Sequence, residues 1–165
     1  MQISIMETKL DKVLPVRHKL LKPDSWPTDK PFELRLTSAD ISELAIHLLA
    51  SANGRTIGIL SAGPEFCPFT SCNDAWRTRG FAVDKTVRRQ GVGTALMKAI
   101  MLKTYRRGAR SLWGTPRIVG ALHTHMHFGC ETIGEQYDVP QFGLHQNVIS
   151  RLTDDLISSL GDGIE

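Results

Sequence analysis

Residues 88–94, with the sequence RRQGVGT, have the composition of a turn that binds an anion. Two arginines, Arg88 and Arg89, stand just before Gly91 and Gly93, and a helical pattern of apolar residues follows. At the start of a helix the first backbone N–H groups have no helical partner, and the helix dipole adds partial positive charge. Glycine keeps side chains away from such a site. Arginines near a helix start oppose the dipole, and a bound phosphate would resolve that conflict.

Two common phosphate motifs do not fit this segment. A P-loop requires Gly-Lys-Ser or Gly-Lys-Thr at the end of its glycine loop, and the chain has neither string. A dinucleotide fingerprint requires a third Gly or Ala where this chain has Leu96, and an acidic residue about 20 positions further on, where it has Arg110, Ser111 and Leu112. A glycine pair alone is also compatible with a turn that serves only the backbone. The residues by themselves leave an anion site and a plain turn open.

Three closely spaced histidines, His123, His125 and His127, raise the question of a metal site. On a helix, His123 and His127 share a face while His125 points elsewhere, so ligation by all three is geometrically poor. The cysteines number three, an odd count, and offer no second pair to complete a zinc site. We therefore expect no bound metal.

Apolar spacing and turn residues predict the elements that position these candidates. A helical pattern covers residues 90–105, after the arginine pair, and a strand pattern at 76–83 precedes it. The Asn53-Gly54 pair indicates a hairpin. The other expected elements are a helix at 10–21 that Pro15 limits or kinks, hairpin strands at 43–50 and 56–61, a strand at 111–114, a helix at 119–128, strands at 131–137 and 144–152, and loops at 22–31 and 63–73. This order predicts an α+β fold.

Composition and charge are those of an ordinary globular domain. The chain has 165 residues, of which 41% are hydrophobic and 22% are charged. Its net charge of +3 is too small to indicate nucleic acid as a partner. No apolar run reaches the ~18 residues of a membrane helix, and the N-terminal residues lack the pattern of a signal peptide. We therefore expect a cytoplasmic protein without a nucleic-acid or membrane partner.

The glycine motif and its surroundings resemble the GNAT superfamily of acyl-CoA N-acyltransferases. The signature of that family is [QR]-x-x-G-x-[GA] after a strand, and Arg88, Gly91 and Gly93 fill its defined positions. The stretch RGFAVDKTVRRQGVGTALM at residues 79–97 is similar to the family's strand, turn and helix. The stretch LWGTPRIVGALHTHMHFGCETIGE at residues 112–135 is similar to the strand and helix that follow.

This resemblance extends over residues 43–152 and implies a fold. We expect a GNAT-like α+β fold in which a mixed, mostly antiparallel sheet is flanked by helices. The single N-acetyltransferase domain is expected at residues 1–153, followed by a C-terminal tail at 154–165 that is either a helical turn or disordered.

The resemblance also implies a co-substrate and the residues that bind it. We expect acetyl-CoA as acyl donor and the primary amine of a small molecule or peptide as acceptor, and we leave a homodimer open. The backbone amides of the turn would hold the CoA pyrophosphate, and the end of the preceding strand would hydrogen-bond the pantetheine arm and polarise the thioester carbonyl. The expected cofactor-binding residues are Phe81, Ala82, Val83, Arg88, Arg89, Gln90, Gly91, Val92, Gly93 and Thr94.

One residue that is common in the family's site is absent here. Where many members have a Tyr that protonates the leaving thiolate, alignment of Ala121 and Gly129 with the family pattern places His125. Histidine can act as a general acid near neutral pH, so His125 is the first catalytic candidate. His145, in a Gly-x-His sequence that some relatives share, is the second, as acceptor of a proton from the substrate ammonium.

The resemblance implies an acetyl-CoA-dependent N-acetyltransferase in which the amine attacks the thioester directly, without a covalent enzyme intermediate. The absence of the Tyr keeps a non-catalytic acyl-CoA-binding or sensing module as an alternative. An acyltransferase with a longer acyl donor is a further one. Acidic candidates for a general base, Glu65, Asp74 and Glu135, have no spacing that singles one out.

Overall fold

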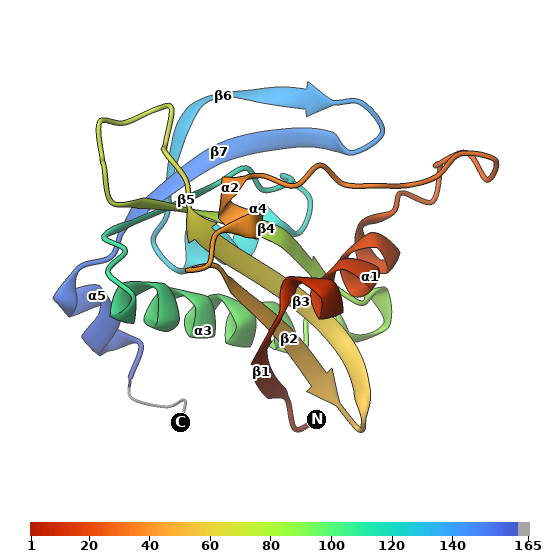
Figure 1. The fold of residues 1–165 in the computed structure, drawn as a ribbon, viewed down its shortest axis with the longest axis horizontal. Coiled ribbons are helices and arrows are strands. Elements are labelled where there is room, and N and C mark those ends of the chain that lie inside the picture. The colour runs from red at the N-terminus through yellow and green to blue at the C-terminus, as the bar shows by residue number, and fades with distance from the viewer. Residues whose placement is uncertain (162–165) are drawn as a thin grey trace.

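The computed structural model describes residues 1–161, which form one sheet with helices on both faces (Figure 1). The elements in chain order are β1 (Ser4–Thr8), α1 (Leu10–Leu21), α2 (Ser38–Ile41), β2 (Ile46–Ala52), β3 (Arg55–Pro64), β4 (Ala75–Val83), the 3₁₀ turn η1 (Lys85–Val87), α3 (Val92–Arg106), β5 (Ser111–Gly114), α4 (Ala121–His127), β6 (Glu131–Val139), β7 (Gly143–Arg151) and α5 (Asp154–Ser159).

The seven strands lie in the order β1-β2-β3-β4-β5-β7-β6. Among the neighbouring strands of residues 1–161, β4 and β5 run parallel, and the other pairs are antiparallel. The parallel pair is joined by the crossover through α3, as a parallel connection requires. The structure therefore confirms the expected α+β fold with a mixed, mostly antiparallel sheet flanked by helices.

The sheet has a hydrophobic core on each face. The apolar stripe of α3 places Leu96 and Ile100 in the larger core, together with Leu48 of β2. On the opposite face, Val13 of α1 packs with Leu49 of β2. Because neighbouring side chains of a strand point to opposite faces, β2 contributes to both cores. The sheet is thereby held between α3 and α1.

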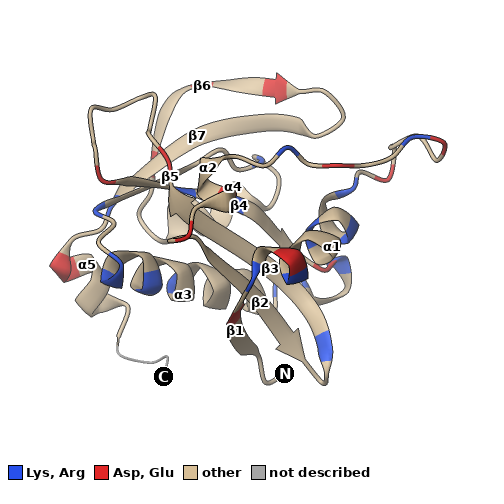
Figure 2. Ribbon diagram, viewed as in Figure 1, with Lys and Arg blue, Asp and Glu red and all other residues tan. Residues whose placement is uncertain are grey.

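Charged residues are distributed over several elements. Lys and Arg occur on α1, on the loop that follows it and on α3, whereas Asp and Glu occur on α1 and the loop but not on α3 (Figure 2). Within residues 1–161, no helix is long and apolar enough to span a membrane.

The sequence patterns located the longer elements and missed two short ones. The helix expected at residues 10–21 is α1, which continues through Pro15. The strand β1 and the four-residue helix α2 were not predicted, because each is too short to show a period. β3 extends to Pro64, into a segment expected to be a loop. The expected tail begins as the helix α5, and its residues 162–165 lie outside the described part of the chain.

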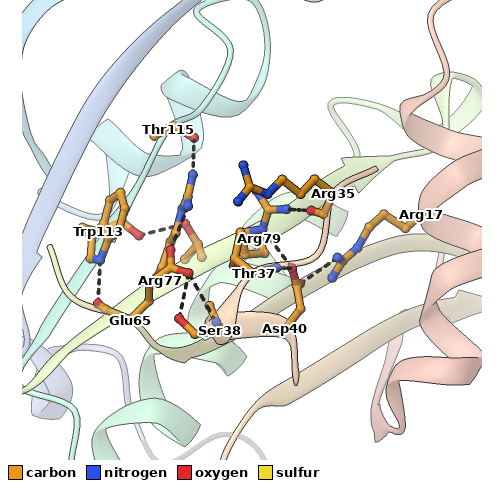
Figure 3. Close-up of polar contacts among 12 residues, drawn as sticks. Arg17, Arg35, Thr37, Ser38, Asp40, Glu65, Arg77, Arg79, Trp113 and Thr115 are labelled. Carbon is orange, nitrogen blue, oxygen red and sulfur yellow. Dashed lines mark hydrogen bonds and ion pairs between the residues drawn. The ribbon is translucent and has the colours of Figure 1, made fainter. Parts of the chain in front are cut away.

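A buried ion-pair network joins α1 to α2 and to the sheet (Figure 3). Arg17 of α1 is 1% exposed. Its Nη1 donates to Asp40 Oδ1 at 2.7 Å, and its Nη2 donates to Ser61 Oγ at 2.8 Å. The second carboxylate oxygen of Asp40 accepts hydrogen bonds from the Thr37 backbone N–H at 3.0 Å and from Arg79 Nε at 3.1 Å. Burial raises the pKa of Asp40, but the two arginines and the Thr37 hydrogen bond outweigh burial and hold it below its usual value.

Replacing Asp40 by Asn keeps the size of the side chain and removes the charge shared by two arginines. Removing one partner of a buried ion pair leaves the other charge uncompensated, so Asp40→Asn should lose roughly 3–5 kcal/mol of unfolding free energy, measured by urea denaturation at pH 7. Asp24→Asn is the control, because Asp24 pairs with Lys85 on the exposed surface and should change stability little. Equal losses in the two variants would contradict the role of Asp40.

The same carboxyl group should make stability depend on pH. Because the pKa of Asp40 lies lower in the folded state than the usual value of about 3.9, its contribution is present above that value and is lost as the pH falls through the folded pKa. The difference in unfolding free energy between wild type and Asp40→Asn should be constant above about pH 5 and shrink below about pH 4. A difference that stays constant through the acid range would argue against this linkage.

Candidate active site

The sheet opens where β4 and β5 separate. The two strands pair only over residues 75–77 and 111–113, whereas β4 continues to Val83. Beyond Arg77, no strand of residues 1–161 pairs with this side of β4, which leaves backbone N–H and C=O groups open to a ligand. A cleft of about 1030 Å³ runs along this open edge.

A β-bulge at Gly80 shapes the open part of β4. The register between β3 and β4 shifts next to this residue, which has a left-handed φ of +62°. A Cβ at Gly80 would lie 2.3 Å from Arg17 Nε, so both the backbone and the packing require glycine. The extra residue brings Phe81 and Val83 to the face that carries Trp76 and α3. The bulge thus sets which side chains border the cleft.

The glycine motif forms the other end of the cleft, at the start of α3. Arg89 and Gly91 have left-handed φ values of +64° and +85°, and Gly91 is the N-cap residue without a capping side chain. The first helical hydrogen bond runs from the Ala95 N–H to the Gly91 carbonyl at 2.9 Å. The N–H groups of Val92, Gly93 and Thr94, the first three residues of α3, are therefore not used by the helix. A non-glycine residue in a strained conformation at such a turn is typical of a functional site.

All the expected cofactor-binding residues except Gln90 line the cleft. Gln90 is exposed and lies outside the lining. A Cβ at Gly93 would lie 3.2 Å from Phe81 Cζ and 3.5 Å from Thr124 Oγ1. Gly93 therefore also allows α3 to approach β4 and α4 closely.

His125 of α4 is almost completely buried, with 3% of its surface exposed. Its Nδ1 lies 2.9 Å from the Ala121 carbonyl oxygen, which can only accept a hydrogen bond, so we assign the proton to Nδ1 and a lone pair to Nε2. Its ring packs edge-on against Phe81, with centroids 5.8 Å apart. Burial lowers the pKa of His125, so the imidazole is neutral near pH 7.

The Nε2 atom of His125 is buried and has no hydrogen-bond partner among residues 1–161. It lies beside Gly114, where an added Cβ would be 3.5 Å from Nε2 and 2.3 Å from Thr78 Oγ1. Gly114 ends β5 and Thr78 belongs to β4, so this nitrogen is at the point where the two strands separate. An unsatisfied buried acceptor costs roughly 1–3 kcal/mol, and a hydrogen bond from a ligand in the cleft would remove that cost.

His145 of β7 lines the same cleft. Its Nδ1 lies 2.8 Å from the Gly143 carbonyl oxygen, and its ring stacks on Tyr137 of β6 at 6.0 Å. The Tyr137 hydroxyl donates to Asn147 Oδ1 at 2.9 Å, and burial raises the pKa of Tyr137, so the phenol keeps its proton near pH 7. Sequence reasoning did not identify Tyr137, because its place in the cleft depends on strand pairing between β6 and β7.

Arg77 and Arg79 of β4 lie on the face of the strand that is opposite to α4 and His125 (Figure 3). Arg77 Nη1 donates to Glu65 Oε2 at 2.7 Å, and the Arg77 guanidinium lies 4.6 Å from the centroid of the Trp113 ring. Because side chains alternate along a strand, Arg77 and Arg79 point toward α2 while Thr78 points toward α4. Glu65, weighed above as a general base, is therefore held in an ion pair.

The described part of the chain contains no group of three or more His, Cys, Asp or Glu side chains placed to hold a metal. His123 lines the cleft with His125, whereas His127 is not part of its lining. Cys67, Cys72 and Cys130 are free thiols. The three histidines of α4 are thus not brought to one point.

Comparison with solved structures shows the same fold in acetyltransferases. An N-acetyltransferase from Staphylococcus aureus Mu50 has 16% identity and a TM-score of 0.67, over 93% of this chain and 100% of that chain. The yncA protein of Salmonella typhimurium, solved with its cofactor acetyl-CoA, has 16% identity and a TM-score of 0.67, over 92% and 95%. The ribosomal-protein-S18-alanine N-acetyltransferase of Escherichia coli has 17% identity and a TM-score of 0.63, over 90% and 91%.

At these identities the solved structures show likeness of fold, and the family follows from sequence. No curated protein sequence matches the chain. The family model described as "Acetyltransferase (GNAT) domain" matches residues 43–128, just over half of the chain and including the glycine turn, β4 and His125. The chain therefore belongs to the GNAT acetyltransferase family.

Proposed function

We propose that this protein transfers an acetyl group from acetyl-CoA to a primary amine by direct attack. The observation that carries the proposal is one cleft that joins the free N–H groups of α3, the open edge of β4 and the unpartnered Nε2 of His125. Membership of the family supports an acyl-CoA donor. The yncA structure, which contains acetyl-CoA, supports acetyl as the group transferred.

The residues of the cleft fit a CoA ester. Helix N–H groups and the α3 dipole suit a pyrophosphate, and Arg88 and Arg89 add positive charge at that end. The open edge of β4 offers backbone donors and acceptors to the amides of a pantetheine arm. Arg88 Nε donates to the Val83 carbonyl at 3.2 Å, which ties the turn to the end of this strand.

Bound acetyl-CoA would supply a thioester, whose carbonyl carbon gains a bond to the amine nitrogen as the carbon–sulfur bond breaks. A backbone N–H on the edge of β4 can stabilise the negative charge that develops on the carbonyl oxygen. The substrate ammonium must lose one proton to become the attacking amine, its nitrogen must lose a second proton as the amide forms, and the leaving thiolate must gain one. The protein therefore needs a proton acceptor and a proton donor near the separation of β4 and β5.

We assign the proton donor to His125, as the sequence predicted. Because His125 is neutral, its Nε2 must first take up the proton that the attacking nitrogen loses as the amide forms, and can then deliver that proton to the thiolate. His145 is the proposed acceptor of the ammonium proton. Tyr137, a protonated phenol in the same cleft, is a second candidate for the donor.

The wider assignments remain proposals. The acceptor is a small molecule or a peptide, CoA binds without a metal, and one domain covers residues 1–153. A cytoplasmic location and a homodimer stay predictions.

The proposed function is tested by thiol release from acetyl-CoA in the presence of a panel of amines and amino acids. We expect turnover with at least one primary amine and formation of its N-acetyl product by mass spectrometry. CoA binding without any acyl transfer would instead support the binding module, and faster turnover with a longer acyl-CoA would change the donor.

Gly93→Asp tests the pyrophosphate site. Gly93 is the second residue of α3, so the new carboxylate would satisfy the helix start itself and repel the pyrophosphate. We expect CoA affinity to fall by more than about tenfold, equivalent to 1.4 kcal/mol, in calorimetric titrations. Gly93→Asn, which crowds Phe81 equally and adds no charge, is the matched control and should keep more affinity. Unchanged CoA affinity in a folded Gly93→Asp variant would overturn the site.

Replacement of His125 tests its role as thiolate acid. His125→Ala and His125→Phe should lower turnover at saturating acetyl-CoA on the order of 10²-fold, because both remove the proton donor. The Phe variant keeps an aromatic ring against Phe81, which separates chemistry from packing. CoA affinity should change little in either variant.

A loss below about threefold in both His125 variants would remove this residue from the catalytic assignment. Tyr137→Phe, measured in the same assay, would then identify the donor, because it removes only the hydroxyl group. A large loss in Tyr137→Phe with normal His125 variants would transfer the acid role to β6.

A further inference from the structure

A second cavity, of about 630 Å³, lies next to the main cleft. It shares Arg77 and Arg79 with the cleft as lining residues, so these two residues of β4 border both spaces. Its other walls come from α2 and the loop before it, and from Glu65, which directly follows β3. This cavity therefore reaches β4 from the face that carries α2.

The position of the second cavity suits the approach of the acceptor. Arg77 and Arg79 flank Thr78, which lies beside Gly114 and His125 at the separation of the strands. Because side chains alternate along β4, the cavity and His125 lie on opposite faces of this strand. A molecule in the second cavity would thus approach β4 from the face opposite to His125.

The second cavity carries more positive than negative charge. Arg35, Arg77 and Arg79 line it, against one carboxylate, Glu65, which Arg77 already holds at 2.7 Å. Asp40, behind Arg79, also compensates a second buried arginine. Among residues 1–161, no ion pair includes Arg35, whose carbonyl oxygen accepts from Arg79 (Figure 3). Among the described residues, Arg35 is therefore the lining arginine without an ion-pair partner, and Arg79 shares the single charge of Asp40 with Arg17.

We propose that the acceptor enters through this cavity and carries an anionic oxygen group, a carboxylate or a phosphate, that binds Arg35 and Arg79. The inference rests on the proposed function, because it concerns the amine that attacks the thioester. The guanidinium fork matches two oxygens of a carboxylate or phosphate. Leu36 and Ile41, exposed at 37% and 66%, also line the cavity and favour an acceptor with an apolar portion.

Matched acceptors test this inference in the thiol-release assay. Leucine is compared with leucinamide, which has the same shape and an α-amine but no carboxylate, and phosphoethanolamine is compared with ethanolamine. We expect kcat/KM to be at least about tenfold higher for the anionic member of one pair. The pair that shows the preference distinguishes a carboxylate from a phosphate. The less basic amine of leucinamide would favour the amide if the carboxylate played no part.

Variants of Arg35 connect the preference to the cavity. Arg35→Gln should raise the KM for the preferred anionic acceptor about tenfold. It should leave unchanged the KM for acetyl-CoA and the KM for the neutral member of the acceptor pair. Arg35→Lys should restore part of the lost affinity for the anionic acceptor. Calorimetry with the same acceptor and CoA-bound protein, in which no turnover occurs, should give the highest affinity for wild type, a lower one for Arg35→Lys and the lowest for Arg35→Gln. Arg55→Gln, at an exposed arginine of β3, is the control and should change neither constant.

The outcomes separate the two proposals. Turnover with equal kcat/KM for the charged and neutral members of both pairs would overturn the anionic acceptor and leave the proposed function intact. Anion preference that Arg35→Gln does not reduce would overturn the assignment to this cavity. Absence of turnover with every acceptor would overturn both.

Discussion

The parallel pairing of β4 with β5 ends after three residue pairs, and the whole cleft depends on that end. A fully paired β4 would leave no open backbone edge for a ligand. The bulge at Gly80 lies in the same open stretch, and Arg17 packs against it. Asp40 in turn holds Arg17 by a buried ion pair. A charge interaction between two helices thus lies directly behind the strand that shapes the site.

Polar groups that have no hydrogen-bond partner within residues 1–161 gather along this cleft. They include the first N–H groups of α3, the free edge of β4 and Nε2 of His125. Each lacks a hydrogen bond that a buried or half-buried polar group requires, and the residues that carry these groups line one cleft. A long ligand with phosphate at one end and amides in its middle would satisfy these groups in order. This correspondence supports a CoA ester more strongly than any one residue does.

Local sequence determined which of these features could be predicted. The strand, turn and helix around Gly91 are contiguous, so their pattern was visible, and the family resemblance placed His125 in the cleft. The buried position of Arg17 was not predicted, because a buried arginine in the apolar stripe of a helix contradicts the pattern that identifies a core face. The places of Tyr137 and Arg79 were not predicted, because their neighbours come from distant segments of the chain. Strand pairing brings Tyr137 to His145, and an ion pair joins Arg79 to Asp40. Non-local contacts of this kind have no period in the sequence.

The proposed reaction requires that an amine on the α2 face of β4 can reach a thioester beside His125 on the α4 face. In the proposed direct transfer the amine and the thiolate are bound to the same carbon, so a CoA ester on the open edge of β4 and an amine that comes from the α2 face must meet within a few bond lengths. Gly114 makes this meeting possible. A Cβ there would lie 2.3 Å from Thr78 Oγ1 and would fill the space between the strands beside His125 Nε2. The glycine at the end of β5 is therefore as much a part of the proposed site as the glycines of the turn. Gly91 and Gly93 would admit the phosphates, and Gly114 keeps open the point at which acyl transfer would occur.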